Sequence, residues 1–103
     1  MSTIKIRTKR VDGATLIRVL ITHPMETGRR KDEMTGETVA AHYIRTVRIE
    51  HKARTVASCD FSTAVSRDPY VSVRLKGGEP GDPIRVSWED NQGQKDSQDA
   101  VIE

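Results

Sequence analysis

Four side chains in this sequence are of the types that most often bind a metal or attack a substrate: His23, His42, His51 and Cys59. Three imidazoles and one thiolate can in principle hold zinc or iron. However, no two of them have the spacing of about two to four residues that is typical of a local metal motif. A nucleophilic Cys and His pair would need a hydrogen bond that a sequence does not reveal. We therefore predict no metal, no cofactor and no catalytic residue, and expect the histidines at exposed strand ends.

Cys59 alternates with Ala57 and Phe61, so we expect an unreactive thiol on the core side of a strand. Because it is the only cysteine, an internal disulfide and a four-thiolate metal site are excluded. No carboxylate stands in an apolar stretch that would raise its pKa for acid catalysis. The Gly77-Gly78 pair is not followed by a helix, so it does not predict a phosphate cradle. These observations favour a binding or structural protein over an enzyme.

The elements that carry these side chains are expected to be strands, because apolar residues recur at every second position without a helical period. We expect strands over residues 4–11, 14–22, 39–50, 55–61, 71–76, 84–89 and 94–103, with weak pairing of the tail Ala100-Val101-Ile102 in the last. Seven short strands with frequent turns are typical of a two-sheet sandwich. We therefore predict an all-β fold, an immunoglobulin-like antiparallel β-sandwich in a single domain over residues 1–103, with Trp88 in its core.

Composition limits the partners of the protein. The 103 residues suffice for one modest core, and no apolar run approaches the length of a membrane span or a signal segment. Residues 1–54 carry twelve Lys and Arg against six Asp and Glu, whereas residues 55–103 carry five against nine. The basic residues are scattered along strands with few aromatics and no nucleic-acid motif. We expect no nucleic-acid or membrane partner, and charges that pair across strands.

The strand expected at residues 14–22 is apolar on both faces. Leu16 and Leu20 stand opposite its main apolar side and would be exposed in a monomer. We predict that they bind a partner protein together with Tyr43 or Ile44 from the next strand. The alternative is that a segment of the same chain covers them.

A long polar loop follows this strand, from about residue 23 to residue 38. Long loops in small domains usually have a function. Pro24 fixes an extended entry, and Met25 offers an adaptable apolar contact at an exposed site. A cationic cluster, which would attract acidic surfaces, comes next. The predicted partner-binding residues of the loop are His23, Pro24, Met25, Arg29, Arg30 and Lys31, and the alternative is a mobile tip with solvated charge.

Several short motifs occur in a specific order. They are His23-Pro24-Met25-Glu26-Thr27-Gly28, Arg30-Lys31-Asp32, Ala41-His42-Tyr43-Ile44, Asp68-Pro69-Tyr70, Lys76-Gly77-Gly78 and Trp88-Glu89-Asp90-Asn91-Gln92-Gly93. Together they closely resemble the SoxZ family, over nearly the whole chain. The resemblance implies an immunoglobulin-like sandwich without catalytic residues of its own, which forms a heterodimer with SoxY in bacterial thiosulfate oxidation. SoxY carries the sulfur intermediates on a cysteine in a flexible, glycine-rich tail.

The resemblance further implies transient contacts with enzymes of the SoxAX, SoxB and SoxCD types, and a periplasmic location reached by export with SoxY, without a signal peptide of its own. This chain has no glycine-flanked cysteine, so the resemblance assigns it the scaffold role and gives Cys59 no sulfur-carrying role. Two other classes remain open. One is a small non-haem iron sandwich of the superoxide-reductase kind, which usually needs four histidines where this chain has three. The other is a free-standing binding module.

Overall fold

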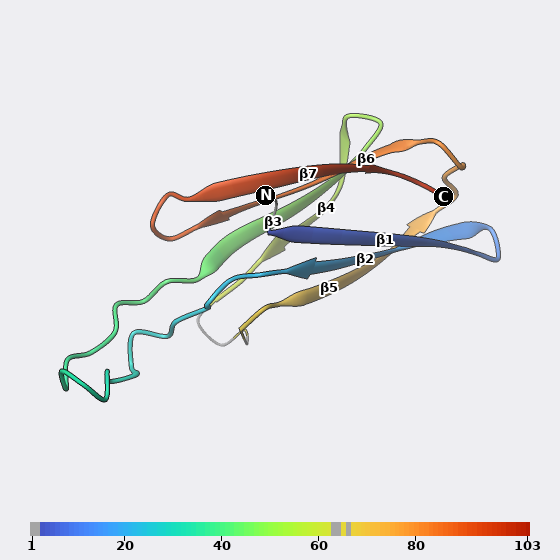
Figure 1. Cartoon of the computed structure of the whole chain (residues 1–103). Coiled ribbons are helices and arrows are strands. Elements are labelled where there is room, and N and C mark those ends of the chain that lie inside the picture. The colour runs from blue at the N-terminus through green and yellow to red at the C-terminus, as the bar shows by residue number, and fades with distance from the viewer. Residues whose placement is uncertain (1–2, 63–64, 66) are drawn as a thin grey trace.

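The computed structural model describes residues 3–62, 65 and 67–103, and it contains seven strands in two antiparallel sheets (Figure 1). One sheet has the order β1-β2-β5 and the other the order β4-β3-β6-β7. The prediction of an all-β, two-sheet sandwich is confirmed. The described residues include no helix of the length and apolar character that crossing a membrane requires. The strands are β1 (Ile4–Val11), β2 (Ala14–Ile21), β3 (Ile44–His51), β4 (Arg54–Asp60), β5 (Tyr70–Lys76), β6 (Pro83–Asp90) and β7 (Lys95–Val101).

The core lies between the two sheets and follows the period-two pattern of the strands. β2, β3 and β6 each contribute three residues to it, which are Ile17, Val19 and Ile21, then Ile44, Val47 and Ile49, then Ile84, Val86 and Trp88. Trp88 of β6 is buried as predicted, and its indole Nε1 donates to the Thr3 hydroxyl at 3.0 Å. Ala57, Cys59 and Phe61 pack against this core from the β4 side, as the alternation in the sequence predicts.

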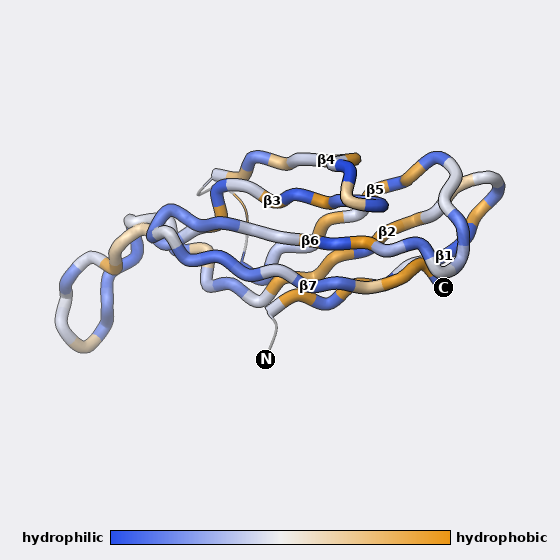
Figure 2. The backbone as a smooth tube through the Cα atoms, turned by 90° about the horizontal axis from the view of Figure 1, so that it is seen from above, coloured by the Kyte–Doolittle hydropathy of each residue, from blue (hydrophilic) through white to orange (hydrophobic). Residues whose placement is uncertain are grey.

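Most strand boundaries lie within one residue of the prediction, but two elements differ. β7 pairs with β6 in continuous register from Lys95 to Val101, so Ala100 and Val101 of the expected tail belong to the ladder and Ile102 lies outside the strand. β3 begins at Ile44 instead of residue 39. The connection between β2 and β3 is therefore longer than expected and spans residues 22–43, which we call the arm. Figures 1 and 2 show the arm extending beyond the ends of the two sheets.

A bulge near the start of β3 changes which side chains face the core. Ile44 pairs with Asp90 and Thr46 pairs with Glu89, so Arg45 is an extra residue in the ladder. A bulge of this kind shifts the alternation of faces by one residue. Ile44 consequently joins the core and has no exposed surface. The expectation that Ile44 lies on an outer face with Leu16 and Leu20 is wrong for this reason.

Candidate functional site

The outer surface of the sheet β1-β2-β5 presents apolar side chains to solvent. Leu20 is 43% exposed and pairs across the strands with Tyr70, which is 59% exposed. Leu16 lies on the same face of β2 and is half-buried. The alternative expectation, that a segment of the same chain covers both leucines, is therefore wrong for Leu20. Tyr43, in contrast, lies next to β3 of the other sheet and packs against the core, so the expectation that it shares a face with Leu20 is wrong.

Cations surround these apolar residues. In the ladder between β1 and β2, Lys5 lies opposite Leu20, Arg7 opposite Arg18 and Lys9 opposite Leu16. Because Leu16, Arg18 and Leu20 point outward from β2, the β1 cations opposite them lie on the same outer face. None of the three strands contains Asp or Glu. We use the term cationic face for the outward residues Lys5, Arg7, Lys9, Arg18, Arg74 and Lys76 together with Leu16, Leu20 and Tyr70.

The cations of this face have no ion-pair partner among the described residues. No ion pair between described residues includes any of the six. On the other sheet, Arg85 of β6 and Asp99 of β7 do pair, at 2.7 Å. The prediction that charges pair across strands is therefore correct for that pair and wrong for the cationic face.

The arm is a hydrogen-bonded hairpin. The Glu26 amide donates to the His42 carbonyl at 2.6 Å, and the His42 amide donates back to Glu26 at 3.0 Å. Further out, the two sides are joined again by a bridge between Lys31 and Thr38. At the tip, the Asp32 carboxylate accepts from the Met34 amide at 2.8 Å, and the Met34 residue is 96% exposed. The arm thus presents an apolar side chain on an ordered turn.

The cations of the arm are exposed, as the sequence predicts for Arg29, Arg30 and Lys31. Arg30 forms a two-point ion pair with Glu26, with its Nη2 and Nε donating at 2.9 and 3.0 Å. This hydrogen bonding lowers the pKa of Glu26 and raises the pKa of Arg30. Arg29 and Lys31 take part in no ion pair between described residues. The arm as a whole carries three Lys and Arg against four Asp and Glu, so its positive charge is local to residues 29–31.

The base of the arm is buried, contrary to expectation for two residues. Met25 has a positive φ of 49° and packs in the core, where its sulfur accepts from the Ile44 amide at 3.3 Å. His23 is buried as well and lies edge-on to the Trp88 ring, with centroids 5.2 Å apart. The expectations that Met25 is exposed and that His23 stands at an exposed strand end are wrong. Pro24 between them is exposed.

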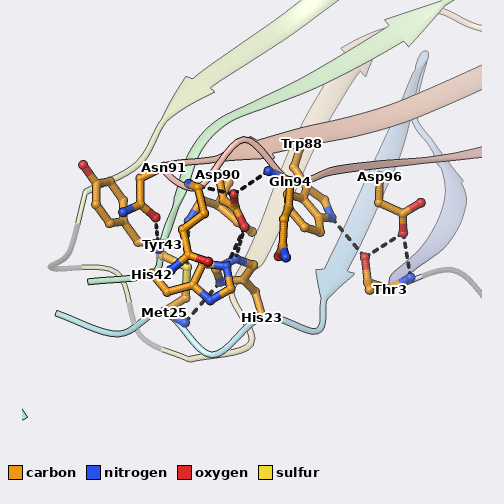
Figure 3. A network of polar contacts seen from close by, with 12 residues as sticks. Thr3, His23, Met25, His42, Tyr43, Trp88, Asp90, Asn91, Gln94 and Asp96 are labelled. Atoms are coloured by element: carbon orange, nitrogen blue, oxygen red, sulfur yellow. Dashed lines mark hydrogen bonds and ion pairs between the residues drawn. The ribbon is translucent and has the colours of Figure 1, made fainter. Parts of the chain in front are cut away.

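His23, His42 and Asp90 form a cluster that joins the arm to the end of β6, and we call it the clasp (Figure 3). Both imidazoles contact Oδ2 of Asp90 through Nε2, at 3.1 Å from His23 and 2.7 Å from His42. The other carboxylate oxygen accepts from the backbone amides of Gln92 and Gln94, at 3.0 and 2.9 Å. Asp90 therefore accepts four hydrogen bonds, although it is only 2% exposed.

The protonation of the clasp follows from its contacts. Burial acts to raise the pKa of Asp90, but hydrogen bonds from His23, His42 and the two backbone amides outweigh it, and the net pKa is lowered. Asp90 is then ionised at neutral pH and has no proton to give as a general acid. The burial of Asp90 was not predicted from the sequence, although its position two residues after Trp88 places it on the same inward face.

The clasp brings three potential metal ligands together, since one ligand atom from each residue lies within 4.8 Å of the others. However, Nδ1 of His23 accepts a hydrogen bond from the Met25 amide at 3.1 Å. The proton of a neutral His23 is then on Nε2, the atom that would have to be free to bind a metal. Neither Cys59 nor His51 belongs to this group within the described part of the chain. The donor set fits a hydrogen-bond network and does not fit a metal.

Comparison with solved structures defines the class of fold. A superoxide reductase in the oxidized state aligns with a TM-score of 0.69 and 15% identity, over 99% of this chain and 88% of that one. A superoxide reductase (neelaredoxin) from Archaeoglobus fulgidus in the reduced form aligns with a TM-score of 0.66 and 15% identity, over 98% and 87%. At this identity the likeness concerns the fold alone, which is a two-sheet immunoglobulin-like β-sandwich. Comparison with curated proteins gave no match.

The sequence assigns the chain to a family within this fold. Residues 4–101 match the family model described as sulphur oxidation protein SoxZ. The chain therefore belongs to the SoxZ family, and the resemblance carried by its motifs is confirmed. This match connects the protein to sulfur oxidation, and the likeness to superoxide reductases supplies no function.

Proposed function

We propose that this protein is a noncatalytic scaffold that binds SoxY, the carrier of covalently bound sulfur intermediates, in thiosulfate oxidation. Membership of the SoxZ family supports a partner from the sulfur-oxidation system. The observation that carries the choice of surface is Leu20, which is 43% exposed on a strand whose other face lies in the core. We further propose that the protein works in the periplasm after export together with SoxY.

The proposed SoxY contact is formed by Leu16, Leu20 and Tyr70. Tyr70 takes the place of Tyr43 and Ile44, because it lies directly opposite Leu20 on the same face. Burying the exposed apolar area of Leu20 and Tyr70 would contribute about 2 kcal/mol for each residue, at roughly 25 cal/mol per Å². Contacts of this size are sufficient for single substitutions to change the yield of a complex.

Coexpression with SoxY tests this contact. The Leu20→Glu variant places a carboxylate in the apolar centre of the face and should reduce copurification with SoxY by at least about tenfold. Val101→Glu is the matched control, because Val101 is also exposed but lies on β7 of the other sheet. Thermal melts of both variants should match the wild type. Equal recovery of SoxY with Leu20→Glu and with the wild type would refute the proposed contact.

The arm is proposed as a second docking element, for the sulfur-bearing tail of SoxY or for the SoxAX, SoxB and SoxCD type enzymes that act on it. Its support is an ordered hairpin with an exposed Met34 and the unpaired charges of Arg29 and Lys31. A partner that binds such a preformed element loses less conformational entropy. Acidic surfaces on the enzymes would be attracted by the two cations.

Kinetics of thiosulfate oxidation in the reconstituted system test the arm. The double variant Arg29→Glu/Lys31→Glu should lower kcat/KM several-fold at low salt, and the loss should shrink as salt screens the charges. Arg30 is left unchanged because its ion pair with Glu26 supports the hairpin. Arg54→Glu/Lys95→Glu, at exposed positions on β4 and β7, is the control with the same change in charge. Unchanged kinetics of the arm variant would remove the arm from the mechanism.

A further inference from the structure

The cationic face concentrates positive charge, and no ion pair between described residues includes any of its cations. Six Lys and Arg side chains project from three adjacent strands that contain no Asp or Glu. The opposite sheet has carboxylates among its cations, as in the pair between Arg85 and Asp99. The two sheets thus differ in charge balance, since β3, β4, β6 and β7 contain both signs of charge and the strands of the cationic face contain cations alone.

The arrangement within the face costs stability in the free protein. Arg7 and Arg18 are directly opposite each other on β1 and β2. Like charges at directly opposite positions destabilise a sheet. No carboxylate of the described chain forms an ion pair with either residue. A bound partner that placed a carboxylate between the two guanidinium groups would convert this repulsion into attraction.

The cations alternate with apolar residues across the strands. One row consists of Lys5, Leu20 and Tyr70, and another consists of Lys9, Leu16 and Arg74, with neighbouring strands roughly 4.8 Å apart. An apolar centre with charged residues around it is the usual composition of a protein–protein interface. Surfaces that bind single-stranded nucleic acids instead combine cations with several stacking aromatics, and Tyr70 is the sole aromatic residue of the three strands.

We propose that the cationic face binds an acidic protein surface, whose carboxylates lie over the six cations while its aliphatic side chains contact Leu16, Leu20 and Tyr70. This inference rests on the proposed function, since it takes SoxY as the protein that supplies the acidic surface. Beyond the apolar contact with SoxY, the six cations would recognise carboxylates of SoxY. The cations accelerate encounter and set the orientation, and the apolar residues hold the complex.

Stopped-flow measurement of SoxY association over a salt series tests the inference. The triple variant Lys5→Gln/Arg7→Gln/Lys9→Gln removes three charges from the face and leaves its apolar residues in place. Its association rate constant at low salt should be about tenfold or more below the wild-type value. The control Arg48→Gln/Arg54→Gln/Lys95→Gln removes three exposed charges from the other sheet and should change the rate by less than about twofold.

The possible outcomes separate the inference from the proposed function. Equal losses in the two triple variants, or a wild-type rate that does not depend on salt, would overturn the inference while SoxY binding itself stands. Absence of SoxY binding at every salt concentration would overturn the proposed function and the inference with it. Binding to duplex DNA or to phosphatidylglycerol vesicles, or self-association, that is lost in the face variant while SoxY binding is not would also overturn it.

Discussion

His23 and Met25 are joined by a short local hydrogen bond, in which the Met25 amide donates to Nδ1 of His23 at 3.1 Å. This bond leaves Nε2 as the protonated nitrogen, and Nε2 faces the carboxylate of Asp90 at 3.1 Å. One backbone amide thereby decides the chemistry of the clasp. It makes Nε2 of His23 a hydrogen-bond donor that ties the base of the arm to β6. The proton on Nε2 also prevents this nitrogen from binding a metal.

The tautomer of His23 is the first prediction. Near pH 8, nitrogen NMR of the histidine rings should show His23 with its proton on Nε2. Addition of equimolar Zn²⁺ or Fe²⁺ should leave these signals in place, and gel filtration should remove the metal, because binding would require the Met25 amide to lose its acceptor. Stoichiometric metal that survives gel filtration and shifts the His23 and His42 signals would instead support the non-haem iron alternative.

Removal of the central carboxylate should destabilise the fold. In Asp90→Asn, one oxygen and one NH₂ group replace an ionised carboxylate that accepts four hydrogen bonds. The NH₂ group then faces hydrogen-bond donors that have lost their acceptor. We expect a loss of about 2 to 4 kcal/mol in the free energy of unfolding, measured by urea denaturation. The control Asp60→Asn changes an exposed aspartate of β4 and should stay within about 0.5 kcal/mol of the wild type.

The same carboxylate predicts a pH dependence. The pKa of Asp90 lies below its ordinary value of 3.8 in the folded protein, so the unfolded chain binds this proton more tightly. The contribution of Asp90 to stability is therefore present above pH 3.8 and is lost as the pH falls through the folded pKa. Denaturation curves over this range should show a steeper acid loss for the wild type than for Asp90→Asn. Parallel pH profiles would contradict the lowered pKa.

Most of the fold was predictable because its signals are local. The alternation of apolar residues defines the strands, and Asp12-Gly13 marks the turn between β1 and β2. The burial of His23 depends instead on Asp90, which lies 67 residues further along the chain. No local pattern around His23 contains that information. The signal for the burial of Asp90 was its position two residues after Trp88, on the same face of a strand. This position is informative only once β6 is known to continue through residue 90.

The predicted partner-binding residues also divide into those whose orientation follows from the local alternation and those whose orientation depends on strand pairing. Leu16 and Leu20 lie in a regular strand, so the alternation correctly predicts that they face outward. Ile44 stands beside the bulge at Arg45, where the alternation breaks. A bulge is specified by how two strands pair, and the sequence of β3 alone does not reveal it. The cationic face emerges only from the sheet order β1-β2-β5, because β5 is distant from the other two strands in sequence.

Ile44 and Leu20 should therefore respond in opposite ways to truncation. Ile44→Ala removes a fully buried side chain and should lower the free energy of unfolding by about 2 to 5 kcal/mol, with SoxY affinity unchanged for the folded fraction. Leu20→Ala should cost less than about 1 kcal/mol of stability but weaken SoxY binding. Urea denaturation and titration calorimetry distinguish the two. A loss of SoxY affinity in Ile44→Ala at temperatures where the variant is folded would show that Ile44 contributes to the SoxY interface.

The two adjacent glycines after β5 provide a matched test of close packing at the end of the sandwich away from the arm. Gly77 and Gly78 have φ values of 83° and 81°, so alanine at either position carries a similar backbone cost, about 1 kcal/mol. A Cβ at Gly78 would also lie 2.8 Å from the hydroxyl of Thr15 and 3.0 Å from Cδ1 of Ile102, whereas a Cβ at Gly77 meets open space.

Gly78→Ala should consequently be less stable than Gly77→Ala by about 1 to 3 kcal/mol in urea denaturation. Thr15 is fully buried and donates to the Gly77 carbonyl at 2.9 Å, so it has little freedom to move away from the new methyl group. The difference between the variants isolates this contact, because the backbone cost is common to both. Equal stabilities would mean that the turn after β5 is free to shift, and with it the end of the cationic face that carries Lys76.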